Sequence, residues 1–416
     1  MSEKLILKEN AEYSLYQQDL AFQKELNILR NDYYYQMIQA KCTSLVDFLY
    51  KPLDILSGDA YSLRKIDDNT TFYLIVDGMG KGVSASLTSM LITSYINHII
   101  DKTLKSNSFD LHYLISESIE YIRPILLEEE SLSVDYILLN TDENVMHYAK
   151  FAMPALLMQT MNHEIIRLKS NNPPISKYQE SFTISEASTS DIRKFLFYSD
   201  GLSESSTIDS QNVYASFIEE DFLDSFTKED FTNKIFSKIT AQEDDITFIF
   251  INKTSCTHNL VASRRFETAL KNNDIANEWY TEEWNNLTDN AKSIYSAGVV
   301  FTELFMNAYE HGNLNINTQT KHQLLENDTY FETLQNKEKG CTKKITVALH
   351  KVNYNSSTYI ITKICDEGDG FDTQILSKIF RNSHNFNGRG VFVSRQLSQG
   401  IYYNAKGNTV LYINKI

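Results

Sequence analysis

The sequence predicts a multidomain protein of the mixed α/β (α+β) class, and three observations carry that prediction. The chain has 416 residues, which is too long for one ordinary hydrophobic core. Short apolar runs of strand length alternate with amphipathic helical stretches over most of it. A polar stretch at 252–259 lacks apolar periodicity and marks the best boundary between two domains.

Composition narrows the function classes. With 42% hydrophobic and 22% charged residues, the chain reads as globular. The net charge of −15 argues against a nucleic-acid partner. None of the 4 cysteines forms a Cys-x-x-Cys pair, so neither a disulfide framework nor a zinc site is indicated. No apolar run has membrane length and no secretory signal is evident, so we expect a cytoplasmic protein without membrane contact.

The N-terminal segment 1–40 is expected to be a helix. Apolar side chains recur with heptad spacing, at Leu15, Phe22 and Leu29, with Leu26 and Tyr33 at the second offset. Asp19 lies on the same seam and would weaken it. Two interpretations stay open: a coiled coil that joins two copies of the chain, or a helix that packs on the following domain.

The next segment, 41–253, combines apolar strands with amphipathic helices. The strands are expected at 71–76, 134–140, 195–198 and 247–251, and the helices at 85–100 and 111–127. The segment 254–416 repeats the α/β pattern, with a helix expected at 297–311 and strands at 344–350 and 358–365. Between that helix and those strands, 313–343 is a polar insertion of surface helix and loop.

Acidic residues mark the strand ends of the 41–253 segment. Asp77 and Asp200 follow predicted strands, Asp244 precedes one, and Asp59 lies in a Ser-Gly-Asp turn. Any one of these would ordinarily be a turn residue, but loops at adjacent strand ends can converge. Carboxylates suit Mg²⁺ or Mn²⁺, and two such ions would clamp a phosphate and supply a hydroxide. Gly78 would let the backbone turn and bring a carbonyl to the metal.

Four segments carry a family resemblance: 51–61 (KPLDILSGDAY), 77–82 (DGMGKG), 197–202 (FYSDGL) and 244–247 (DDIT). In this order they resemble the bacterial SpoIIE-like serine/threonine phosphatases of the metal-dependent, protein phosphatase 2C-like superfamily. The resemblance covers 41–253 and implies a β-sandwich flanked by helices. It also implies two Mn²⁺ or Mg²⁺ ions and attack by a metal-bridging water, without a covalent phosphoenzyme.

The resemblance assigns roles residue by residue. Asp77 would bridge the two ions, with the Gly78 carbonyl on one of them. Asp200 and Asp244 would hold the other ion, and Asp59 would act through bound water. Asp245 is the neighbouring rival to Asp244. Eukaryotic relatives add a phosphate-gripping arginine, for which the sequence offers no clear equivalent beyond the nearby Lys51.

The segment 254–416 holds a second constellation. Glu303, Asn307 and His311 are spaced by four and share one helix face. That face could ligate Mg²⁺ beside ATP and deprotonate a hydroxyl, or it could simply be solvated. Asp366 follows a predicted strand and begins a motif that also contains Gly368 and Gly370. The motif Gly388-Arg389-Gly390 opens a helix at 391–397, whose backbone N–H groups suit phosphates.

Together these motifs resemble the N, G1 and G2 boxes of GHKL-type ATPases, most closely the anti-sigma-factor serine kinases. The resemblance implies an α/β sandwich with a mixed sheet, bound ATP with Mg²⁺, and a lid at 373–387. Glu303 would be the catalytic base, Asn307 the Mg²⁺ ligand and Asp366 the adenine reader. The lid and phosphate pocket would be shaped by Gly368, Gly370, Gly388 and Gly390.

The two resemblances predict a bacterial partner-switching regulator. It would dephosphorylate, and with ATP also phosphorylate, a Ser or Thr on an anti-sigma-factor antagonist of the STAS-domain type. A sigma factor or an upstream sensor protein is a further expected partner. The N-terminal helix, through Phe22, would favour either the phosphatase or the kinase activity over the other. The alternative is a phosphatase fused to an ATP- and partner-binding anti-sigma-like module without catalysis. A third reading, an inert phosphatase half, conflicts with its full set of carboxylates.

Overall fold

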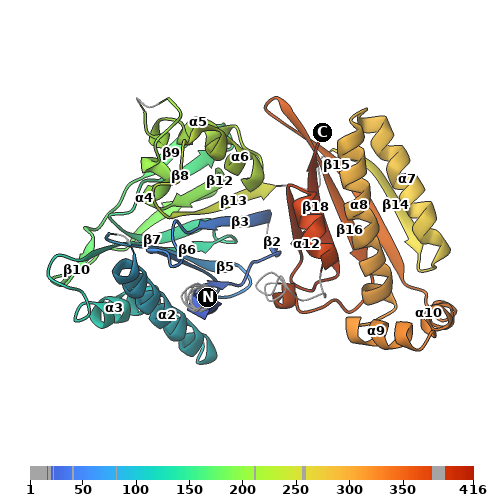
Figure 1. Ribbon diagram of the computed structural model, residues 1–416, viewed down its shortest axis with the longest axis horizontal. Helices are drawn as coiled ribbons and strands as arrows, with labels where there is room; N and C mark the ends of the chain where they lie inside the picture. Colours follow the sequence, from blue (N-terminus) through green and yellow to red (C-terminus); the bar gives the residue numbers. More distant parts are fainter. Residues whose placement is uncertain are drawn as a thin grey trace, which may run out of the picture. The chain divides into compact units, whose positions relative to one another are not determined.

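The computed structural model describes residues 23–39, 42–80, 82–209, 212–254, 259–376 and 389–416, together with residues 16, 20 and 21. The chain divides into two compact units, each treated by itself below. One unit comprises Met1–Tyr33, Val46–Leu223 and Thr232–Lys253, and the other comprises Tyr34–Leu45, Asp224–Phe231 and Thr254–Ile416. Several sheets and helices make up the units, in agreement with the predicted multidomain α+β class (Figure 1).

Two β-sheets dominate the first unit. One has the strand order β1-β4-β5-β6-β7-β11, with β10 paired to β6. Its strands are β1 Arg30–Asn31, β4 Asp59–Lys65, β5 Thr70–Gly78, β6 Ser131–Asn140, β7 Val145–Phe151, β10 Ile175–Ser176 and β11 Ser185–Ser188. Within this unit the other sheet has the order β3-β13-β12-β8-β9. Its strands are β3 Thr43–Lys51, β8 Leu156–Thr160, β9 Ile165–Leu168, β12 Ile192–Tyr198 and β13 Ile246–Thr254. Strand β2, Met37–Gln39, lies in the range Tyr34–Leu45 of the second unit and pairs with β3.

The two sheets face each other and carry helices on their outer sides. Tyr73 of β5 and Phe197 of β12 meet between the sheets, with ring centroids 5.5 Å apart. Helices α2 (Val83–Lys105) and α3 (Leu111–Ile122) lie together, and α2 packs along β4 and β5 (Figure 1). On the other sheet, Phe222 of α5 (Ile218–Leu223) contacts Phe250 of β13. Shorter helical elements complete this part of the chain: α4 Asp200–Glu204, η1 Tyr214–Ser216 and α6 Lys228–Lys238.

The N-terminal segment departs from the single predicted helix. Residues 23–28 are helical, but β1 and β2 occupy much of 30–39, so the helix prediction was wrong there. Strand pairing explains the change, since Asn31 pairs with Leu63 of β4. Leu29 is fully buried within the unit, as expected for a helix that packs on its own domain. Leu15, Asp19 and Phe22 lie outside the described residues, and dimerisation stays a prediction.

The second unit is a five-stranded sheet covered by helices. The sheet order is β14-β15-β16-β18-β17. Its strands are β14 Leu260–Glu267, β15 Lys344–Tyr354, β16 Ser357–Asp366, β17 Gly400–Tyr403 and β18 Thr409–Lys415. Its helices are α7 Lys271–Leu287, α8 Ala291–Asn307, η2 Ala308–Asn313, α9 Thr318–Glu326, α10 Tyr330–Glu338 and α12 Arg389–Gln396. These five strands pair antiparallel with one another, and Gln36 adds a parallel bridge to Tyr403 of β17.

Alternation along the strands gives this sheet two buried faces. Ile360 belongs to the core under α7 and α8 (Figure 1). In this core the rings of Tyr280 and Phe301 are stacked, with their centroids 4.0 Å apart. Ile361, the next residue, belongs to a separate cluster on the opposite face. Phe226 lies in that cluster, 4.7 Å from the ring of Tyr359. Because strand side chains alternate between faces, a sheet buried on both sides needs this second apolar set.

Within the described ranges, no helix combines the length and the apolar character that crossing a membrane requires.

A buried ion pair lies inside the first unit. Asp135 of β6 and Lys150 of β7 are cross-strand neighbours, and the ammonium donates to both carboxylate oxygens at 2.6 Å. Neither side chain has appreciable solvent contact. Burial raises the pKa of Asp135 and lowers that of Lys150, so desolvation opposes both charges and each needs the other.

Replacing Lys150 with Met should therefore destabilise the first unit by about 3–5 kcal/mol, because the Asp135 charge would stay buried and unpaired. Urea unfolding followed by circular dichroism measures the change. Lys177→Met is the matched control, since Lys177 pairs with Glu128 at the surface and should matter little. Equal losses in the two variants would contradict the prediction.

Candidate functional site

Two of the predicted metal-site carboxylates face each other across paired strands. Asp59 begins β4 and Asp77 lies near the end of β5, where the two residues are register partners. Asp77 thus lies inside its strand rather than after it, because β5 continues to Gly78. Like charges directly opposite on a sheet are destabilising. The pair therefore needs neutralisation by protons or by a cation.

The other two carboxylates come from the second sheet of the same unit. Asp200 begins α4 directly after β12, and Asp244 lies two residues before β13. Because β12 and β13 are antiparallel neighbours, both residues lie at the same end of the sheet. Gly201 makes this approach possible: a Cβ there would lie 2.1 Å from the Asp245 carbonyl oxygen and 3.1 Å from the Asp244 Cβ.

Electrostatics show that the four carboxylates share one environment. Burial, the charges of Asp59, Asp200 and Asp244, and a hydrogen bond to Asp200 together raise the pKa of Asp77 to about 10. Burial also raises the pKa of Asp59, against the lowering effect of hydrogen bonds from Thr247 and Ser199. An acid cluster of this kind favours either protons or bound cations.

The donor set fits hard divalent cations. Among the described residues, no three His, Cys, Asp or Glu side chains converge tightly enough to enclose one ion. An ion here would complete its shell with carbonyl oxygens and water, as Mg²⁺ and Mn²⁺ readily do. The Gly78 backbone is pressed against α2, since a Cβ there would lie 2.8 Å from the Ala85 carbonyl oxygen.

The geometry separates Asp244 from its neighbour. Both carboxylate oxygens of Asp245 accept backbone N–H groups, from Leu53 at 2.7 Å and from Gly58 at 2.6 Å. Asp245 thereby holds the loop before Asp59, whereas the Asp244 charge acts on Asp77. Lys51 is engaged elsewhere, with its ammonium 4.0 Å from the centroid of the Phe236 ring.

In the second unit, the predicted N and G2 motifs come together. Glu303 and Asn307 are neighbours on α8, and the Asn307 amide donates to the Glu303 carboxylate at 3.3 Å. Gly390, in the first turn of α12, packs against the same carboxylate; a Cβ there would lie 1.8 Å from Glu303 Oε1. Gly388 lies outside the described residues, so its predicted role is not tested.

The predicted adenine reader lies between glycines. Asp366 is the last residue of β16, and Cβ atoms on Gly312 or Gly368 would lie within 2.8 Å of its carboxylate. The Gly368 N–H donates to that carboxylate at 2.8 Å. Burial raises the pKa of Asp366 to about 6. Gly370 has φ +80°, a backbone conformation that favours glycine.

His311 leaves the face that it was expected to share with Glu303 and Asn307. The helix changes from α to π geometry over Ala308–Asn313, which breaks the spacing of four. The His311 ring instead bonds to the Ile316 carbonyl. The same π turn brings Asn313 to Glu367, whose N–H donates to the Asn313 side chain at 2.9 Å.

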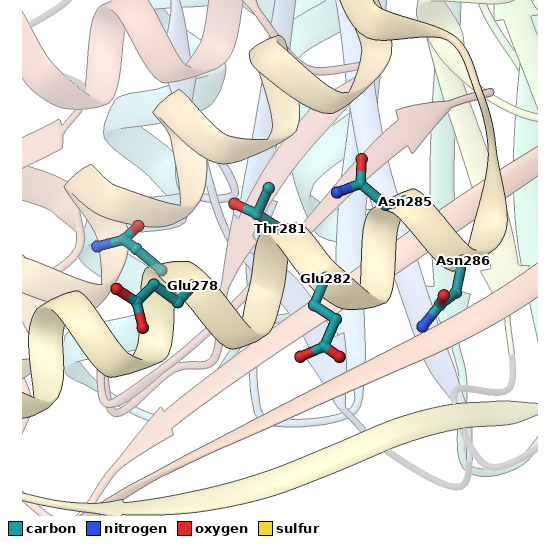
Figure 2. A pocket seen from close by; sticks show the side chains of 6 residues that line it. Glu278, Thr281, Glu282, Asn285 and Asn286 are labelled. Atoms are coloured by element: carbon teal, nitrogen blue, oxygen red, sulfur yellow. The ribbon is translucent and has the colours of Figure 1, made fainter.

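A surface hollow of the second unit lies away from these residues. It measures about 490 Å³ and is lined by polar residues of α7: Asn277, Glu278, Thr281, Glu282, Asn285 and Asn286. Figure 2 shows Glu278 and Glu282 projecting from this helix. None of the predicted site residues lines it.

One family model matches a large part of the first unit. Residues 67–254 match the family model for stage II sporulation protein E (SpoIIE). Over this range the chain is similar to the SpoIIE family. The matched range contains Asp77, Gly78, Asp200 and Asp244, but begins after Asp59.

Individual relatives cover parts of the chain. "Phosphoserine phosphatase RsbP" of Bacillus subtilis (strain 168) is 27% identical over 169 residues, 38% of this chain and 39% of RsbP. The match thus spans about two fifths of that relative's length. The SiaA-PP2C domain of Pseudomonas aeruginosa is 18% identical, with a TM-score of 0.48, covering 58% of this chain and 98% of that one. The RsbU and RsbW domains of a Mycobacterium tuberculosis protein are 13% identical, with a TM-score of 0.44, covering 89% and 94%.

Sequence reasoning missed two residues of the SpoIIE-like domain that support Asp59. The Ser199 hydroxyl donates to the Asp59 carboxylate at 2.7 Å, which joins the two sheets at the acidic end. The Thr247 N–H donates to Ser199 Oγ at 3.1 Å. Both residues lie within the quoted motifs: Ser199 precedes Asp200, and Thr247 follows Asp245 by two positions. Their place in these motifs was the available signal, since a hydroxyl close to a carboxylate often serves as a hydrogen-bond donor.

The raised pKa of Asp77 predicts how the metal-free domain responds to pH. A carboxyl whose folded pKa exceeds its ordinary value of 3.8 stabilises the fold fully below that value. The contribution disappears as pH rises through about 10. In EDTA, the unfolding free energy of the wild type should therefore fall more steeply between about pH 6 and about pH 9 than that of Asp77→Asn.

Urea unfolding at several pH values measures these slopes. Added Mn²⁺ should raise the unfolding temperature of the wild type but not of Asp77→Asn, because the variant lacks a carboxylate expected to hold the ion. Parallel slopes and equal stabilisation by Mn²⁺ would contradict this assignment.

Proposed function

We propose that the SpoIIE-like domain is a metal-dependent protein serine/threonine phosphatase. The observation that carries this proposal is an arrangement of four carboxylates from two sheets, in which Asp59 and Asp77 are cross-strand partners and the charges of Asp200 and Asp244 act on Asp77. The family match over 67–254 supports the same reading. A cluster of this kind costs stability unless cations neutralise it, and that cost is expected at a functional site.

Each residue has a proposed task. Asp77 would bridge two Mn²⁺ or Mg²⁺ ions, with the Gly78 carbonyl beside one of them and Asp200 and Asp244 at the other. Bound together, such ions supply a hydroxide for in-line attack on a phosphate. Asp59, held by Ser199, would orient a water molecule at this centre.

The substrate is proposed to be a phosphoprotein. RsbP, the partial relative, carries the printed name phosphoserine phosphatase, which supports a phosphoserine or phosphothreonine substrate. By the motif resemblance, the expected carrier is a STAS-domain anti-sigma-factor antagonist in the cytoplasm. A sigma factor or an upstream sensor would be a further partner.

For the second unit we propose ATP binding with Mg²⁺ and transfer of phosphate to the same protein. Glu303 would be the base, Asn307 the Mg²⁺ ligand, and Asp366 the acceptor for the adenine amino group. The close packing of Gly390 on Glu303 and of Gly368 on Asp366 supports this reading. The alternative is an anti-sigma-like module that binds ATP and a partner without transfer.

Intact mass of a STAS-domain protein, incubated with this chain, Mn²⁺ and either ATP or none, tests the proposal. Loss of a phosphate without ATP is expected for the wild type and should vanish in Asp77→Asn. Gain of a phosphate with ATP would establish the kinase. A substrate whose mass never changes under either condition would sink both activities.

Two substitutions separate the roles in the second unit. Glu303→Gln should keep nucleotide binding and abolish transfer, because only the base is lost.

Asp366→Asn should weaken binding of a fluorescent ATP analogue. In the wild type that binding should weaken from about pH 7 to about pH 5, since Asp366 gains a proton below its pKa of about 6 and stops acting as a charged acceptor. Equal affinities at both pH values would remove Asp366 from the nucleotide site.

A further inference from the structure

A carboxylate outside the metal-site motifs is buried beside them. Glu25, in the helical residues 23–28, is only 2% exposed. Its Oε1 accepts the Ser57 backbone N–H at 3.1 Å and also the Tyr50 hydroxyl. Its Oε2 has no hydrogen-bond partner among the described residues. Burying an acidic side chain lowers the stability of the fold unless its oxygens are paired. The buried position of Glu25 therefore needs a structural or functional explanation.

The residues that Glu25 contacts lead directly to the acidic cluster. Ser57 Oγ accepts the Asp59 N–H at 3.0 Å, two residues further along the chain. Tyr50, the other donor to Glu25, also reaches the Asp59 carbonyl oxygen at 3.5 Å. A short relay of hydrogen bonds therefore connects the N-terminal helix to the backbone of Asp59.

The same loop is held from its other side. Asp245 accepts the N–H groups of Leu53 and Gly58, while the Gly58 carbonyl accepts the Gly78 N–H at 3.1 Å. The loop between β3 and β4 thus lies between two carboxylates, one on the N-terminal helix and one beside β13. Its last glycine is bonded to the residue whose carbonyl is proposed for the metal.

We propose that Glu25 is a positioning residue of the metal centre: it fixes the loop 53–58 and thereby the backbones of Asp59 and Gly78. The N-terminal helix is then part of the catalytic unit rather than a passive spacer, and a shift of this helix would change metal affinity. This inference rests on the proposed metal-dependent phosphatase activity.

The test compares Glu25→Ala and Glu25→Gln with Lys24→Ala, an exposed position on the same helix. Mn²⁺ binding is measured by isothermal titration calorimetry, and hydrolysis of p-nitrophenyl phosphate is measured against Mn²⁺ concentration. Glu25→Ala should bind Mn²⁺ roughly five- to tenfold more weakly, because Ser57 loses its acceptor. Its kcat should recover at high Mn²⁺. Glu25→Gln keeps an acceptor oxygen and should stay within about twofold of the wild type, as should Lys24→Ala.

The outcomes separate this inference from the activity beneath it. A wild type without Mn²⁺-dependent hydrolysis would refute the proposed function itself. An active wild type with Glu25→Ala unchanged in Mn²⁺ affinity would refute the positioning role alone, and so would a loss of activity that saturating Mn²⁺ does not restore. Should Glu25→Ala fail to fold, Tyr50→Phe carries the test, because it removes the second donor to Glu25. It should weaken Mn²⁺ binding about two- to threefold, and unchanged binding would overturn the proposal.

Discussion

The concentration of negative charge at one end of two sheets is the constraint on which the first unit depends. Asp59 and Asp77 lie opposite each other on one sheet, and Asp200 and Asp244 approach from the other. Such a cluster repels itself unless protons or cations neutralise it. The surrounding architecture holds the carboxylates in place through close strand packing, a glycine where two segments nearly touch, and hydroxyl donors.

The support around this cluster consists of hydrogen bonds to backbone groups. Asp245 and Glu25 are acidic as well, but they accept N–H groups of the loop before Asp59 rather than facing Asp77. Two kinds of carboxylate thus share one region, and their partners distinguish them. In the second unit, glycines pack directly against the carboxylates of Asp366 and Glu303, where a larger residue would not fit.

Much of the strand pattern could be predicted because a strand buried on both faces consists of consecutive apolar residues. The strands expected at 195–198 and 247–251 lie within β12 and β13. Failures came where distant partners decided the outcome. Residues 30–31 joined a strand of the sheet instead of extending a helix. His311 left its expected face because the helix changes to π geometry after Asn307, a change that apolar periodicity does not encode.

By itself, the sequence determined the identity and order of the acidic and glycine motifs, because these are local: a carboxylate at a strand end and a glycine where the backbone must turn or be approached. Only the tertiary structure decided which acids meet. It separated Asp244 from Asp245 by their partners, placed Ser199 on Asp59, and buried Glu25 against Ser57. The physical reason is that a hydrogen bond or a charge interaction depends on distance in space, and residues more than a hundred positions apart become neighbours only when the sheets pack.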